Sequence, residues 1–400
     1  MSVNDRIWNR NFVCMFLAYF GIIASYMIHI PTIPIFLRDL GYPQDLIGLL
    51  TGLFAVTAIL SRPFVGRKLD TGDRRTIFAV GSLITFLASA SYLFLDNPYA
   101  LTAMRLIHGI GLGITTSSAN TIATDFIPPK RMGEGIGYFS LCTVIGLMAA
   151  PALGLFLTER VGVEGAFIAA AAGTFAGFAL SFLIRYSPEQ KAAFREMAAA
   201  NRTRKLAWSD VLERRALRPS TTMLLAGATH NAISSFLALY AESRGVANIG
   251  LYFTVSACTL FFSRIFAGRI TDRKGYSFVV VPGLALGATA VFLLYLANSL
   301  IHFLLIAVLF ALSFGSAQTA LHAMAVTSVP ANRRGAAVGT LFTGLDLSIL
   351  LGSSLAGMLA GMFGYDLMML MLVGPMLLSL AVYFAFGKWD RPRREPHAAQ

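Results

Sequence analysis

Charged residues are scarce in this sequence. Only 13% of its 400 residues are Asp, Glu, Lys or Arg, whereas 56% are hydrophobic and the mean hydropathy is +0.67. A typical soluble domain has about 25% charged residues. A soluble protein with so few charges would expose large apolar patches to water. The composition therefore excludes an ordinary soluble protein and indicates a membrane protein.

Cysteine is rare, and the common catalytic motifs are missing. Cys14, Cys142 and Cys258 lie singly in separate apolar runs, which excludes a disulfide framework and a cysteine-based metal site. The sequence has no Gly-x-x-x-x-Gly-Lys-Ser/Thr loop, so ATP hydrolysis is excluded as an energy source. No grouping of Ser, His and Asp resembles that of a hydrolase. We expect no enzymatic activity, no cofactor and no metal.

Long apolar runs dominate the sequence instead. A helix needs about 20 apolar residues to cross a bilayer. Twelve runs of about this length occur, at residues 12–36, 46–66, 76–95, 99–126, 134–157, 163–185, 219–241, 248–268, 277–297, 301–326, 335–361 and 366–387. They predict an all-α membrane protein with twelve transmembrane helices. The first run lacks the short apolar core and cleavage site of a signal peptide, so we expect it to be retained.

The two halves of the chain are repeats. Ser61 to Asp70 (SRPFVGRKLD) and Ser263 to Asp272 (SRIFAGRITD) lie 202 residues apart and match at six of ten positions. Transporters built from two such units move one unit against the other around a central site. We predict two pseudo-symmetric six-helix bundles, at residues 1–185 and 219–400.

A cytoplasmic linker at residues 186–218 is expected to join these bundles. It is basic and partly amphipathic, which predicts short helices on the inner leaflet with Trp208 and Leu212 facing lipid. The linker either tethers the halves or has a lipid-sensing, regulatory role.

Positive charge gathers on one side of the predicted helices. The net charge is +12, and all but six of the 32 Lys and Arg fall in the termini, the linker or the loops on that side. The six exceptions are Arg38, Arg62, Arg105, Arg160, Arg244 and Arg264. The positive-inside rule then predicts a multi-pass protein of the cell inner (plasma) membrane with both termini in the cytoplasm. Because the basic residues are dispersed, they do not indicate a nucleic-acid partner. We expect a monomer in the lipid bilayer.

Two loop motifs resemble those of one transporter family. The loop after the eighth run has a Gly-x-x-x-Asp-Arg-x-Gly pattern, formed by Gly268, Asp272, Arg273 and Gly275. Its counterpart after the second run retains Gly66, Asp70, Arg74 and Arg75. Together with the twelve runs in two halves, these motifs resemble the major facilitator superfamily over nearly the whole chain. In the motif after the second run, Thr71 and Asp73 stand where the family has Arg and Gly.

The acids of these motifs are expected to join the two halves. A carboxylate at a helix N-terminus gains up to about 2 kcal/mol from unpaired N–H groups and the helix dipole. We predict that Asp70 meets the start of the eleventh helix near Gly335, and that Asp272 meets the start of the fifth near Gly133. Asp125 is predicted to pair with Arg74 or Arg75. These contacts would latch the outward-open state. The alternative is that the loops serve only charge topology.

Two further patterns narrow the resemblance. The fourth run contains an Arg-x-x-x-Gly-x-Gly pattern like that of proton-coupled members, formed by Arg105, Gly109, Gly111 and Gly113. Gly146, Pro151 and Gly154 in the fifth run resemble the Gly/Pro signature of drug and metabolite antiporters, although Ala150 and Leu155 depart from it. Small residues with a Pro let helices approach and bend, as a flexing seal between halves requires. Ordinary helix packing is the alternative.

Asp346 is the expected proton carrier. It lies twelve residues into the eleventh helix, which places it about 18 Å along the helix and near the midplane. Desolvation there favours the neutral form, so the side chain can gain and lose a proton. The alternative is a permanently paired acid. Arg105 is expected to face the cavity as a fixed charge or, alternatively, to bind backbone carbonyls. Arg62 and Arg264 are expected to extend to the inner surface.

We expect polar and aromatic side chains of the cavity-lining helices to form the substrate site. His230, beside Asn231, is near the midplane and can bind substrate or take a proton. His322 lies at the repeat-equivalent position of Asn120. Possible aromatic walls are Tyr26, Tyr138, Tyr240 and Phe342. A structural role in helix packing is the alternative for each of them.

The resemblance implies a secondary transporter that exports a drug or metabolite in exchange for protons by alternating access. The stretch THNAISSFLALYA at residues 229–241 also resembles exporters of opine-type metal chelators. Two alternatives remain. One is a proton symporter or facilitator for uptake of a sugar or organic anion. The other is a lipid-translocating member of the same fold.

Overall fold

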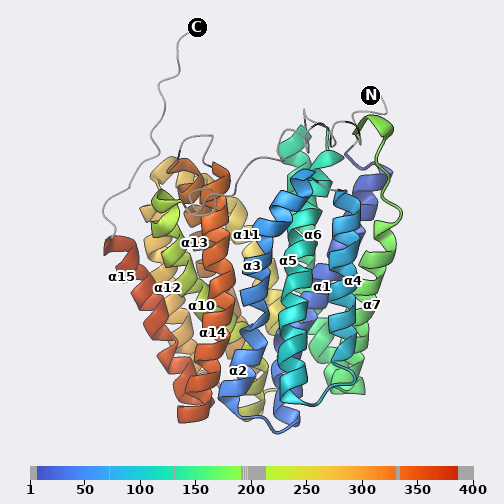
Figure 1. Cartoon of the computed structure of the whole chain (residues 1–400). Helices are drawn as coiled ribbons and strands as arrows, with labels where there is room; N and C mark the ends of the chain where they lie inside the picture. The colour runs from blue at the N-terminus through green and yellow to red at the C-terminus, as the bar shows by residue number, and fades with distance from the viewer. Residues whose placement is uncertain are drawn as a thin grey trace.

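The chain folds into a set of long helices. The computed structural model describes residues 7–71, 73–128, 131–190, 192, 194, 196, 213–329 and 334–385. Every regular element in these residues is helical (Figure 1). In the first half these are α1 (Arg10–Asp39), α2 (Gln44–Gly52), α3 (Phe54–Thr71), α4 (Arg74–Ser91), α5 (Pro98–Asp125), α6 (Met132–Val161) and α7 (Val163–Ser181). In the second half they are η3 (Arg214–Ala216), α10 (Leu217–Ser243), α11 (Gly250–Lys274), α12 (Ser277–Tyr295), α13 (Leu300–Thr327), α14 (Arg334–Met371) and α15 (Val373–Ala385).

Eight helical segments of the described residues are long and apolar enough to cross a membrane. The remaining predicted crossings, at α4, α5, α10 and α15, are shorter or more polar. In α5 the polar residues are inside the protein: Arg105, His108, Thr115 and Ser118 are all buried. They lower the hydropathy of the helix without facing lipid. The sequence therefore predicts more crossings than length and apolarity support on their own.

Breaks in the helices fall at two places. The run at 46–66 forms α2 and α3, which meet at Leu53. The helix α14 has non-helical backbone at Gly364, whose φ of +77° is favourable for glycine. This break separates the predicted helices at 335–361 and 366–387. The predicted helices around Trp208 and Leu212 lie outside the described residues.

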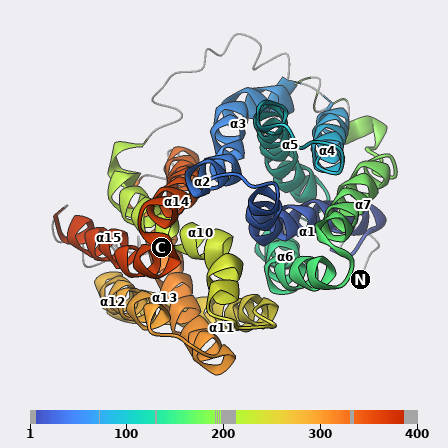
Figure 2. The same ribbon diagram turned by 90° about the horizontal axis from the view of Figure 1, so that it is seen from below.

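Figure 2 shows α1 and α3–α7 gathered on one side and α10–α15 on the other, with α2 beside α14. Local geometry repeats between the two sides. A Cβ on Gly113 of α5 would contact Ser61 of α3, and a Cβ on Gly315 of α13 would contact Ser263 of α11. These glycines are also 202 residues apart. The sequence repeat is therefore matched by the same glycine–serine packing in both halves.

Candidate functional site

Contacts between the two sides of the molecule are close at one end. We call the end where α1 begins and α11 finishes the basic end, and the other the opposite end. Near the opposite end, α2 lies directly against α14. A Cβ added to Gly48 would lie 2.8 Å from Cα of Gly357, and one added to Gly52 would lie 2.8 Å from Cα of Leu350. Backbones this close leave no space for a side chain, so α2 and α14 form a tight glycine seam.

Other contacts join the two sides at the same end. Arg38, at the end of α1, forms an ion pair with Glu242, at the end of α10. The hydroxyl of Thr254 on α11 donates to the carbonyl of Met148 on α6 at 3.3 Å. A Cβ on Gly250 would lie 3.4 Å from Cα of Ala152. The opposite end is therefore closed by backbone packing, a hydrogen bond and an ion pair.

The glycines that the sequence analysis assigned to the seal lie elsewhere. A Cβ on Gly146 or on Gly154 would meet Ile23 or Ile28 of α1, at 2.8 and 3.1 Å. These contacts are within the first half and do not join the two sides. The seam residues were missed, although GLLTG at 48–52 and GMLAG at 357–361 both place small residues four apart, a known signal for close helix packing.

A partly buried ion pair connects the two sides in the middle of the molecule. Nη1 of Arg62 on α3 is 2.5 Å from Oδ2 of Asp346 on α14, and Nη2 donates to Oδ1 at 3.1 Å. The Asp346 side chain is only 14% exposed. Arg62 therefore points toward Asp346 rather than to the surface as expected, held by one hydrogen bond to Oδ1 and by the close approach of the charged groups. In this structure Asp346 is paired, a contact that both a proton carrier and a permanently paired acid could make.

Arg105 holds the break between α2 and α3. Its Nε donates to the carbonyl of Leu50 at 2.8 Å, and its Nη2 donates to the carbonyl of Thr51. The guanidinium lies 4.8 Å from the ring centroid of Phe54. The last carbonyls of a helix lack backbone partners, and a cation there complements the helix dipole. These are the contacts of the alternative interpretation, in which Arg105 binds backbone carbonyls.

The second-half counterpart of Arg62 has a neutral partner. Arg264 on α11 donates from Nη2 to Oε1 of Gln318 on α13 at 2.6 Å. It makes no ion pair with any carboxylate in the described part of the chain. Like Arg62, it remains inside the protein and does not extend to the inner surface.

A small cavity lies near Arg264, between α10, α11 and α13, with Leu147 of α6 also in its lining. Its volume is about 30 Å³, and its lining includes His230, Tyr252 and Ser256. Within the described residues, His230 Nδ1 is buried without a hydrogen-bond partner, and the buried hydroxyls of Tyr252 and Ser256 lie close to each other and have no further partner. The His230 ring stacks on Phe314 with a centroid distance of 4.1 Å. The cavity thus combines the rings of Phe253 and Phe310 with the polar side chains of His230, Tyr252 and Ser256.

The other predicted substrate residues are dispersed. Asn231 donates to Ser348 on α14 at 3.1 Å, and the exposed Asn120 donates to the carbonyl of Thr116 in its own helix. His322 contacts the ring of Phe342 edge-on at 5.8 Å. The rings of Tyr26 and Tyr138 contact those of Phe54 and Trp8, respectively. The hydroxyl of Tyr240 donates to the carbonyls of Leu294 and Tyr295. Tyr240 is fully buried near the opposite end, away from the cavity.

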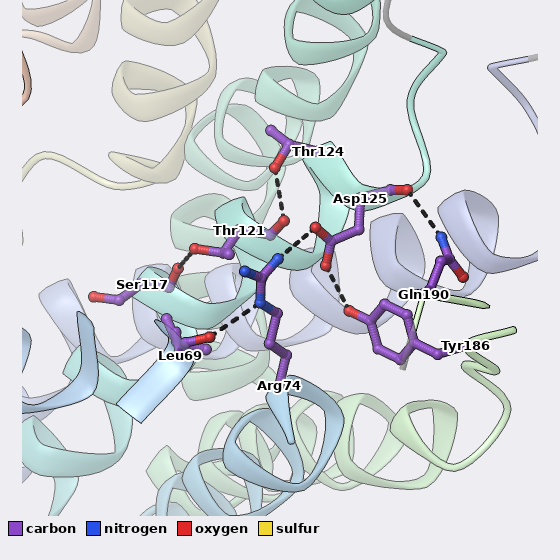
Figure 3. A network of polar contacts seen from close by, with 8 residues as sticks. All are labelled: Leu69, Arg74, Ser117, Thr121, Thr124, Asp125, Tyr186 and Gln190. Atoms are coloured by element: carbon purple, nitrogen blue, oxygen red, sulfur yellow. Dashed lines mark hydrogen bonds and ion pairs between the residues drawn. The ribbon is translucent and has the colours of Figure 1, made fainter. Parts of the chain in front are cut away.

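At the basic end, Arg74 and Asp125 form the centre of a polar network (Figure 3). Arg74 Nη1 is 2.5 Å from Asp125 Oδ1, and its Nε donates to the carbonyl of Leu69. The hydroxyl of Tyr186 donates to Asp125 Oδ2 at 2.8 Å. Burial, with the Asp125 carboxylate beside it, raises the pKa of Tyr186 far above its ordinary value, so the phenol stays a donor. Arg74, Leu69 and Asp125 belong to the first half and Tyr186 begins the linker, so the network ties the start of the linker to the first half and does not latch the two halves together.

The loop motifs themselves are partly described. Asp73 caps α4 by accepting from the backbone N–H of Arg75, with φ of −74°, so this turn does not need the glycine that the family has there. Gly275 ends α11 with φ of +90°. A Cβ on Gly66 or Gly268 would meet nothing within 4 Å. The Arg75 guanidinium lies over Phe182, and Arg273 is exposed. The side chains of Asp70 and Asp272 and the surroundings of Gly133 and Gly335 lie outside the described residues.

Comparisons with known proteins agree with this architecture. The family model of the Major Facilitator Superfamily matches residues 15–275 and 245–400. The staphylopine export protein of Staphylococcus aureus is 23% identical over 90% of this chain and 91% of its own. A multi-drug resistance efflux pump PmrA homolog of Lactococcus lactis is 25% identical over 69% of this chain and 70% of its own. A bacterial homolog of the human lysosomal transporter Spinster superposes with a TM-score of 0.75 at 19% identity, covering 94% of this chain and 95% of its own.

Proposed function

This chain belongs to the major facilitator superfamily, and from that premise we propose that it exports a small molecule, a drug or metabolite, in exchange for protons. The names of two relatives, a staphylopine exporter and a multi-drug efflux pump, support export. The family consists of transporters, so the chain is a transporter rather than an enzyme.

We further propose the topology in which this exchange occurs. Twelve crossings form two six-helix bundles, residues 1–185 and 219–400, joined by the cytoplasmic linker 186–218. The positive-inside rule supports an inner-membrane location with both termini, and therefore the basic end, in the cytoplasm. The glycine seam and the Arg38–Glu242 pair then close the outer side, which corresponds to an inward-open carrier.

The observation that supports proton coupling is the ion pair of Arg62 and Asp346. It bridges the two sides of the molecule in its interior, where an ionisable group is costly and usually functional. The pair exists only while Asp346 is charged. It therefore holds the empty, deprotonated carrier in this conformation. A proton on Asp346 removes the attraction and frees the two halves to move.

This lock accounts for exchange. A carrier that cannot reorient when empty must load either a proton or a substrate before each transition. Protons load from the acidic outer side onto Asp346 and leave on the cytoplasmic side, where substrate loads. Substrate and proton then compete for the same carrier. Such a cycle needs no ATP and no cofactor.

The experiment that tests this function follows proton movement in inside-out vesicles that hold the protein and have an acidic interior. Cationic, zwitterionic and anionic candidates are added outside. We expect proton release from the vesicles when a substrate is added. Proton flow in the same direction as the substrate would instead indicate a symporter, and substrate flux without a proton signal would indicate a facilitator. Transfer of a fluorescent lipid between leaflets, without soluble substrate, would indicate a lipid-translocating member.

A further inference from the structure

The two repeat-related arginines differ in one respect: Arg62 has a carboxylate partner and Arg264 does not. We propose that the counter-ion of Arg264 is an anionic group of the substrate, a carboxylate or phosphate, held by Arg264 and Gln318. The inference rests on the proposed function, since it assigns the substrate class of the same carrier.

The environment of Arg264 is built like that of Arg62. The serine that precedes each arginine packs against an equivalent glycine, Gly315 or Gly113, so the two guanidinium groups start from the same local geometry. Arg264 is half-buried and lies ten residues before the end of α11, about 15 Å along the helix. Among the described residues, its hydrogen-bond partner is the neutral side-chain oxygen of Gln318.

An uncompensated charge at this depth is costly. A buried ion is tolerated when a partner of opposite charge and further hydrogen bonds replace its water. Gln318 supplies one hydrogen bond and no charge, and a guanidinium has five N–H donors in a fork that matches carboxylate and phosphate. Arg264 therefore has both donors and charge available for a planar or tetrahedral anion.

The neighbourhood fits an organic anion rather than an inorganic one. Arg264 lies within electrostatic reach of His230 and His322. One turn further from the basic end, Leu260 lines the cavity that also holds the buried polar side chains of His230, Tyr252 and Ser256. The rings of His230 and Phe310, which are stacked with a centroid distance of 5.9 Å, form an apolar wall of this cavity. A substrate with an anionic group at Arg264 would place its apolar or neutral hydrogen-bonding part beside this wall.

The first test compares the thermal stability of ligand-free protein in phosphatidylcholine nanodiscs at pH 8. Arg264→Gln removes an uncompensated charge, so we expect Tm to rise by about 2 °C or more. The matched control Arg62→Gln leaves Asp346 without its partner, so we expect Tm to fall by at least as much. Gln318→Glu gives Arg264 the counter-ion that Arg62 already has, and we expect it to raise Tm. A fall in Tm for both arginine variants would contradict the proposal.

The second test uses three probes of the same shape and different charge: benzoate, benzamide and benzamidine. We expect only benzoate, at millimolar concentration, to raise the Tm of the unaltered protein, because binding to the folded state stabilises it. The shift should be lost in Arg264→Gln and in Gln318→Glu, and retained in part in Arg264→Lys. Three results would each overturn the proposal of an anion site at Arg264. They are no Tm shift with benzoate, an equal shift with benzamide or benzamidine, and a benzoate shift that survives Arg264→Gln.

An anionic lipid headgroup has the same chemistry as a soluble organic anion. A parallel set of nanodiscs therefore contains phosphatidylglycerol. If phosphatidylglycerol raises Tm through Arg264 and benzoate then gives no further shift, the anion is a lipid headgroup. If benzoate still raises Tm in these nanodiscs, the anion belongs to a soluble substrate. Both assays measure binding without proton flux. If proton exchange is lost while benzoate still binds, only the proposed proton coupling is contradicted. If benzoate does not bind while proton exchange persists, only the anion site is contradicted.

Discussion

Replacing Asp346 with Asn is expected to abolish uphill export while leaving downhill exchange of the same substrate. The amide cannot take or release a proton, and it cannot form the ion pair with Arg62 that holds the empty carrier. One pH unit corresponds to about a tenfold gradient for one-to-one exchange, so a gradient of two units supports about a 100-fold substrate ratio. We expect the ratio to fall to about 1 in Asp346→Asn vesicles.

The measurement is the steady-state substrate ratio together with the exchange rate at zero gradient. Glu159→Gln serves as the control, because Glu159 is an exposed acid near the end of α6 with no ion-pair partner in the structure. Retained downhill exchange separates loss of coupling from loss of folding. If Asp346→Asn still builds a gradient, the proton is carried elsewhere, and His230 becomes the first candidate.

Replacing Gly48 with Val is expected to block transport almost completely. The added side chain would occupy the space of the Gly357 backbone, where even a Cβ would lie 2.8 Å from Cα. Overpacking of this kind costs about 1–3 kcal/mol in cores that can adjust, and more where backbone faces backbone. The closed outer side becomes less stable by at least that amount, while the open outer side has no such contact. Transport should fall by about 10-fold for Gly48→Ala and further for Gly48→Val.

The measurement for the seam is the initial export rate per folded transporter, with Gly374→Ala as the matched glycine control. A Cβ at Gly374 would meet nothing within 4 Å, so this variant should export like the unaltered protein. Normal export by Gly48→Ala would show that α2 and α14 do not need to touch during the cycle.

The sequence was sufficient for an all-helical fold and for the approximate position of its long helices. Apolar runs have a period and a length that the bilayer dictates, so helix positions follow from local sequence alone. The pairing of Arg74 with Asp125 was within reach, because both lie at helix ends on the same side of the membrane.

The sequence could not predict which side chains pair with one another inside the helix bundle. Which residue faces Asp346 depends on how α3 and α14 are rotated and how closely they pack, and neither is set by local sequence. A surface-seeking interpretation of Arg62 and Arg264 was wrong because both found interior partners, Asp346 and Gln318. The role of Arg105 was hidden because it depends on the break at Leu53, where α2 leaves carbonyls to be satisfied. Gly52, next to that break, was the only signal.

The most direct test of the proposed Arg62–Asp346 lock is to measure the distance across the outer side as a function of pH. Spin labels at Tyr99 and Ile301 suit it, because both are exposed, lie 202 residues apart and begin α5 and α13 at the opposite end. The three native cysteines are replaced first. At pH 8 the account predicts a single short distance, set by the Arg62–Asp346 pair, and at acidic pH a second, longer one. Asp346→Asn should show the longer distance at both pH values. A distance distribution that ignores pH, or an Asn variant that stays closed, would contradict the claim that protonation of Asp346 releases the two halves.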